Sequence, residues 1–152
     1  MPNVPKSAPD IDPHRDAVYR WEDSWADWNR NTGTAKACRT LIRKACEHYR
    51  VPAPTVVVHP QRTFSWSIPR LSRISIQGGR HRERGGRNAA TALHEAAHHI
   101  AYHLHGERIQ DHGPTFLGIY LDLLARTKVA PRIALETTAR KHGLRWRRSE
   151  KI

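Results

Sequence analysis

Residues 88–105, NAATALHEAAHHIAYHLH, and the following residues 106–116, GERIQDHGPTF, decide the fold of this chain. Apolar side chains recur at helical spacing through the first segment, at Leu93, Ala97, Ile100 and Leu104. Asn88 is a favourable N-cap residue, and Gly106 is a common residue just past a helix end. The pattern therefore predicts a helix over 88–105 that packs one face on the core.

The HEAAH pattern at 94–98 carries the chemistry of this helix. Positions i and i+4 differ by about 40° of rotation and about 6 Å of rise, so His94 and His98 point the same way. Two imidazoles in this arrangement can bind one zinc ion, and Glu95 lies where it can reach a water on the metal. The pattern predicts a single Zn²⁺ per chain, with Glu95 as general base in hydrolysis.

A catalytic zinc ion needs a third protein ligand, and several residues after the helix are candidates. The longer HExxHxxGxxH pattern is absent, because Ala101 and Leu104 stand where it requires Gly and His. Glu107 and Asp111 are possible ligands after the helix end. We favour His112, because it follows a short loop and precedes a second helix that can fold back across the first.

Other polar side chains of this region have weaker claims to a functional role. His99 and His103 form a second i, i+4 pair, for which we expect exposure or a supporting role rather than metal binding. Tyr102 and Tyr120 are able to polarise a substrate carbonyl, although tyrosines on helices more often pack.

The rest of the chain predicts an α+β fold with a small sheet packed on the histidine helix. Helices are expected at 17–28, 34–50, 114–127 and 131–142, and strands at 55–59, 63–68 and 71–76. Thr34 is the expected N-cap of the second helix. The strand LSRISI at 71–76 alternates apolar and polar residues, and we expect it to be the edge strand that holds an extended substrate.

Composition and length indicate one domain of modest size. We divide the chain into a disordered N-terminal arm at 1–15, which contains four prolines, a single domain at 16–145 and a basic tail at 146–152. No apolar run reaches the length of about 20 residues that a membrane span needs, and the N-terminus lacks the apolar segment of a secretory signal, so we expect no membrane partner and a cytoplasmic location. Cys38 and Cys46 lie eight positions apart in one predicted helix, about 12 Å along its axis, and are expected to stay reduced.

The charge is strongly basic, with 26 Lys and Arg against 14 Asp and Glu and a net charge of +12. Cations concentrate at 70–87 and at 140–151. The first stretch leads into the metal helix, and its candidate DNA contacts are Arg80, Arg82, Arg84 and Arg87. The charge therefore indicates either nonspecific nucleic-acid binding or a solvated basic surface. In the tail, Trp146 either stacks on a base or anchors the tail to the core.

The segments HEAAHH and DHGPTF closely resemble the SprT/Spartan-like zinc peptidases, whose pattern is HExxH, a loop and HGxxF. The resemblance implies a small zincin-like domain of the minigluzincin type acting on a protein or peptide. It implies His94, His98 and His112 as zinc ligands and Glu95 as the base. It assigns structural roles to Gly113, Pro114 and Phe116.

The whole chain is still more similar to a group of small metallohydrolases from bacteria and phages. The features shared with that group are Trp21-Glu22, the helix that contains Cys38, and the segment from Leu121 to Leu124. This similarity would place a phage-encoded chain in the host cytoplasm. The chain has two cysteines and so lacks the four that form a zinc ribbon in some SprT-like proteins.

Three functions remain open from the sequence. The first is a zinc peptidase, the second is a basic nucleic-acid-binding protein with a structural or vestigial zinc site, and the third is a zinc hydrolase of non-peptide amides or esters. Glu95 discriminates between the first two, because a structural site needs only the ligands. The first and third functions differ only in their substrate, and the sequence does not indicate which substrate is cleaved.

The basic stretch yields the first testable prediction. Replacing Arg80, Arg82, Arg84 and Arg87 by Ala should weaken binding to single- and double-stranded DNA, because these side chains would contact phosphates. Binding of the unmodified chain should fall with salt, with a log–log slope of about −0.9 per phosphate neutralised on duplex DNA. Titrations at two salt concentrations measure both effects, and an absence of binding at low salt would contradict the prediction.

Overall fold

The computed structural model describes residues 12, 14–25, 34–59, 65–77, 88–109 and 111–148. Within these ranges the elements follow in the order α1 (Arg15–Trp25), α2 (Ala35–Tyr49), β1 (Thr55–His59), β2 (Trp66–Ile68), a 3-10 helix η2 (Pro69–Leu71), β3 (Arg73–Gln77), α3 (Ala89–His105), α4 (Pro114–Arg126) and α5 (Arg132–Lys141). The mixture of helices and a small sheet confirms the predicted α+β class. Helix α1 begins at Arg15, within the range predicted to be a disordered arm, and Trp28 lies outside the described residues.

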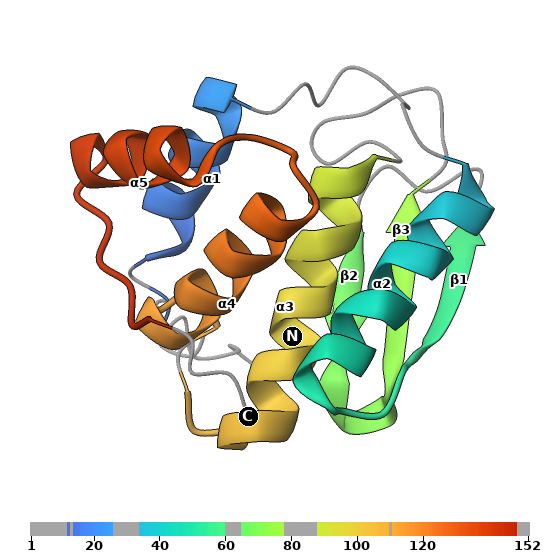
Figure 1. The fold of residues 1–152 in the computed structure, drawn as a ribbon. Helices are drawn as coiled ribbons and strands as arrows, with labels where there is room; N and C mark the ends of the chain where they lie inside the picture. Colours follow the sequence, from blue (N-terminus) through green and yellow to red (C-terminus); the bar gives the residue numbers. More distant parts are fainter. Residues whose placement is uncertain are drawn as a thin grey trace, which may run out of the picture.

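Helix α3 runs through the middle of the molecule (Figure 1). It contacts α2 and the sheet on one side and α4 on the other, while α5 contacts both α4 and α1. Most residues of α3 are buried, including Ala92, Ala96, Ala97 and Ala101. A helix that is buried on most of its circumference belongs to the core, and small side chains let its neighbours approach. Any side chain that α3 aims at a cavity is therefore held on a rigid element.

The sheet has the strand order β1-β3-β2, with β3 parallel to β1 and antiparallel to β2. The prediction that 71–76 forms the edge strand is therefore wrong: its strand, β3, is central, and Ile74, Ser75 and Ile76 are all buried. Alternation along a strand indicates which face is buried, but it does not indicate which neighbours pair with the strand. The edge strand that contacts α3 is β2.

Capping residues fix the ends of the two helices that flank the sheet. The Thr34 side chain accepts a hydrogen bond from Ala37 N at 3.0 Å, and Asn88 Oδ1 accepts one from Thr91 N at 2.9 Å. Gly106 ends α3 with φ of +81°, a backbone conformation that favours glycine, and its N–H bonds to Tyr102 O at 2.8 Å. This break turns the chain toward α4.

The two cysteines lie in the core and are not paired. Cys38 is 1% and Cys46 0% exposed, which confirms the prediction of reduced thiols. Burial, with a smaller contribution from Glu47, raises the pKa of the Cys46 thiol to about 12. None of the helices in the described ranges is long and apolar enough to cross a membrane.

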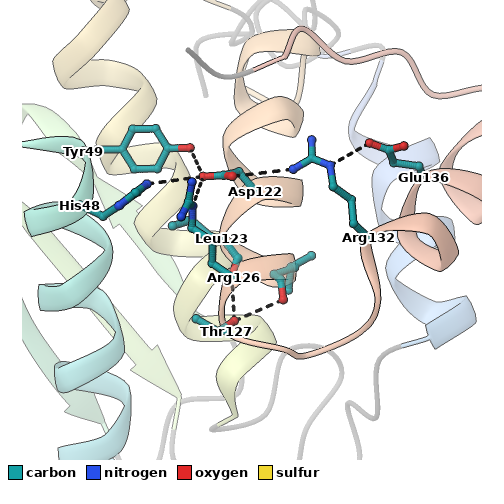
Figure 2. Close-up of polar contacts among 9 residues, drawn as sticks. His48, Tyr49, Asp122, Leu123, Arg126, Thr127, Arg132 and Glu136 are labelled. Carbon is teal, nitrogen blue, oxygen red and sulfur yellow. Dashed lines mark hydrogen bonds and ion pairs between the residues drawn. The ribbon is translucent and has the colours of Figure 1, made fainter. Parts of the chain in front are cut away.

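The carboxylate of Asp122 on α4 contacts residues of α2 and α5 as well as a residue of its own helix (Figure 2). It accepts hydrogen bonds from the Tyr49 hydroxyl at 2.6 Å and from Arg126 Nε at 2.9 Å. Arg132 lies 3.7 Å from its other oxygen and also pairs with Glu136. Asp122 is only 8% exposed, so its charge depends on these partners.

We predict that Asp122→Ala lowers the free energy of unfolding by about 2–4 kcal/mol, because it removes the carboxylate that accepts from the buried Tyr49 hydroxyl and pairs with Arg126 and Arg132. Urea denaturation measures this change. Glu47→Ala is the matched control, since the exposed Arg43–Glu47 ion pair should contribute only about 0.5 kcal/mol. Equal effects of the two substitutions would show that Asp122 does not hold the helices together.

Candidate metal centre

Three imidazoles converge at the junction of α3 and α4. Helix α3 supplies His94 and His98, and His112 stands just before Gly113, the N-cap residue of α4. The Nε2 atom of His94 lies 3.2 Å from that of His98 and 3.3 Å from that of His112. Zinc–nitrogen bonds of about 2.1 Å at tetrahedral angles place ligand nitrogens about 3.4 Å apart. These two separations therefore fit one tetrahedral metal ion, and the ligand atoms of all three residues lie within 4.8 Å of one another.

The tautomers of two of these histidines favour the same conclusion. His94 Nδ1 lies 2.8 Å from Glu22 Oε2, and His112 Nδ1 contacts Asp12 Oδ2. A carboxylate only accepts hydrogen bonds, so each Nδ1 carries the proton and each Nε2 presents a lone pair. Two lone pairs 3.3 Å apart in a buried site repel each other unless a cation lies between them. The donor set therefore fits a zinc ion.

His98 is held by packing, and no carboxylate among the described residues is hydrogen-bonded to its ring. Its ring stacks on Phe116 of α4, with ring centroids 4.3 Å apart and planes 22° from parallel. Phe116 is fully buried and also contacts the rings of His94 and His112. The resemblance implies a structural role for Phe116. These contacts show what that role is, because the Phe116 ring packs against all three imidazoles.

Burial favours the neutral form of two of the three imidazoles, His98 and His112. It lowers the pKa of His98 well below the ordinary value, and the neighbouring His94 and His112 lower it further. Burial and His94 also lower the pKa of His112, against the opposing effects of Asp12 and Glu22. Only the neutral imidazole binds a metal, so these shifts favour metal binding near neutral pH.

Glu95 lies beside the histidines and is 7% exposed. Burial raises the pKa of its carboxyl to about 7, with Glu22 acting in the same direction and His94 opposing both. A group with a pKa near the working pH is suited to accepting and returning a proton. Glu95 does not belong to the group of convergent metal-binding atoms, which contains only the three histidines among the described residues.

A cavity of about 440 Å³ opens directly onto this site. Its walls include the three histidines, Glu95, the whole of β2 and the side chains of Tyr19 and Tyr102. The Tyr19 ring lies 5.3 Å from the His112 ring, and nothing in the local sequence around Tyr19 indicated this position. The candidate ligands and the candidate base thus share one cavity with the edge of the sheet.

The other residues that the sequence offered as metal ligands or catalytic groups lie outside the group of three convergent nitrogens. Glu107 and Asp111 line the cavity but lie outside the ligand group, so the geometry favours His112 as third ligand. The Tyr120 hydroxyl is buried and donates to Glu22 at 2.7 Å, which makes Tyr120 a packing residue. His99 is buried and its Nε2–H donates to Pro52 O at 2.7 Å, while His103 is exposed.

The structure describes only part of the two basic stretches that were predicted to bind nucleic acid. Arg80, Arg82, Arg84 and Arg87 lie outside the described residues. In the C-terminal basic stretch, the exposed cations are Arg140, Lys141, Arg145, Arg147 and Arg148. Trp146 packs against the core under Arg140, whose guanidinium lies 5.2 Å from the ring centroid, as expected for a residue that anchors the tail.

Comparisons with other proteins give no independent assignment, because no family model, curated protein or solved structure matches the chain. The function must therefore be inferred from the geometry and chemistry of the site.

We predict that the chain binds one zinc ion and that His112→Ala greatly reduces this binding, because it removes one of three convergent nitrogens. Metal analysis of purified variants measures the zinc content. Glu107→Ala and Asp111→Ala are the matched controls and should retain the metal. Loss of zinc in either control, together with retention in His112→Ala, would show that the third ligand is misassigned.

Proposed function

We propose that this chain is a zinc-dependent hydrolase of the zincin type that cleaves peptide bonds. The observation that carries the proposal is that the His94, His98 and His112 nitrogens, Glu95 and the edge strand β2 all face one cavity. A purely structural zinc site is closed by four protein ligands. Here three ligands border a space large enough for part of a substrate. The resemblance to SprT/Spartan-like peptidases supports the same reaction.

Each residue of the site has a distinct role in the proposed hydrolysis. His94, His98 and His112 would hold the metal, which when bound supplies a Lewis acid that acidifies water and polarises a carbonyl. Glu95 takes the proton from the attacking water and returns it to the leaving nitrogen. Its burial keeps solvent from competing for that proton. Glu22 holds His94 in the tautomer that directs Nε2 toward the metal.

The edge strand β2 gives the proposal a substrate class. It pairs with β3 on one side, and no strand within the described ranges pairs with its other side. Trp66, Ser67 and Ile68 line the same cavity as Glu95. A polypeptide added alongside β2 would be held by main-chain hydrogen bonds, which accept varied side chains. We therefore propose an extended segment of polypeptide as the substrate, bound at β2 rather than at the strand over 71–76.

We predict that Glu95→Gln retains the fold and the zinc ion but lowers hydrolysis of unfolded proteins and peptides by at least about a hundredfold. The amide is nearly isosteric with the carboxylate but cannot accept the proton from water. Turnover assays on zinc-loaded protein measure the effect, and Glu47→Gln on the exposed surface of α2 is the control for the loss of one charge.

The remaining outcomes separate the alternative functions. Activity near that of the unmodified chain in Glu95→Gln would remove Glu95 from the mechanism. An unmodified chain that binds zinc but cleaves no unfolded protein, DNA-bound protein or peptide would refute the peptidase. Hydrolysis of simple esters or amides by that chain would then favour the non-peptide hydrolase, and its absence would favour the basic protein with a structural zinc site.

A further inference from the structure

Asp12 lies ahead of α1 and contacts a residue 100 positions later in the sequence. Its Oδ2 accepts the Nδ1–H of His112, and the two side chains are 15% and 8% exposed. The sequence predicts that Asp12 belongs to a disordered arm. The structure instead brings it to the back of a candidate metal ligand, on the side of the ring opposite the converging Nε2 atoms.

The contact repeats an arrangement already present at a second ligand. Glu22 of α1 accepts the Nδ1–H of His94, just as Asp12 accepts that of His112. Both acids come from the N-terminal part of the chain, and both contact residues near the junction of α3 and α4. A carboxylate behind a ligating imidazole fixes the ring and makes its other nitrogen a stronger donor to the metal.

The second oxygen of Asp12 supplies an independent observation. Its Oδ1 atom is buried and has no hydrogen-bond partner among the described residues. A buried carboxylate with an unsatisfied oxygen is unfavourable unless a positive charge lies nearby. A divalent cation on His112 Nε2 would provide that charge from across the ring. The metal and Asp12 should therefore stabilise each other.

We propose that Asp12 is a positioning residue of the metal centre, orienting His112 and raising the affinity of the site for a divalent cation. The inference rests on the metal site of the proposed function and does not depend on which substrate is cleaved. It makes Asp12, which precedes α1 in the chain, part of the metal centre.

The experiment compares zinc affinity among variants of the full chain by competition with a chromophoric chelator. Asp12→Asn and Asp12→Ala should weaken zinc binding by about 10- to 100-fold, the usual range for loss of such a partner. Asp16→Asn is the matched control, because Asp16 is an acid of the same segment whose side chain is 72% exposed. Glu22→Gln provides the reference for loss of the corresponding carboxylate at His94.

Thermal unfolding with and without zinc separates positioning from general stabilisation. The increase in unfolding temperature on adding zinc should be smaller in Asp12→Ala than in the unmodified chain and unchanged in Asp16→Asn. Asp12 variants that bind zinc like Asp16→Asn, or that lose equal stability with and without zinc, would overturn the inference. An unmodified chain that binds no zinc would refute the metal centre itself, a failure distinct from loss of the Asp12 effect alone.

Discussion

The carboxylate of Glu22 lies between the Nδ1 of His94 and the hydroxyl of Tyr120, at 2.8 and 2.7 Å. It is 1% exposed, and both donors help to offset the cost of burying its charge. Those donors belong to α3 and α4, whereas Glu22 belongs to α1. The bonds that orient His94, a candidate metal ligand, therefore also link these three helices. A substitution of Glu22 would therefore disturb both the orientation of His94 and the packing of the three helices.

The electrostatics of the site differ from those of the whole chain. The protein carries a net charge of +12, yet Asp12, Glu22 and Glu95 are gathered around three imidazoles. Burial favours the neutral form of two of these, His98 and His112. The group of acids and imidazoles has more negative than positive charge when the acids are ionised. Burial raises the pKa of Glu95 to about 7, which is one way to reduce that excess. A bound divalent cation is another, so the metal would contribute to stability as well as to chemistry.

The parts of the site that the sequence could predict are local. Helical spacing within HEAAH and a helix start just after His112 were enough to identify three residues that the structure brings together. Asp12 was assigned to the arm, and Glu22 entered only through a resemblance, because contacts across 100 and 72 residues leave no periodic signal. The strand order β1-β3-β2 escaped prediction for the same reason. Element type follows from neighbours in the chain, whereas pairing follows from the whole fold.

The spacing of ligands and supporting carboxylates along the chain also bears on how quickly a metal ion enters and leaves. His94 and His112 are 18 residues apart, so a fragment comprising α3 and α4 already holds every candidate ligand. Contacts over short separations form early in folding. The supporting carboxylates of Asp12 and Glu22 come from residues much earlier in the chain and contact the far side of the His112 and His94 rings. Because the site opens onto the cavity, the ion would be released on that side, and Asp12 and Glu22 would prolong its residence by keeping His112 and His94 in their binding orientation.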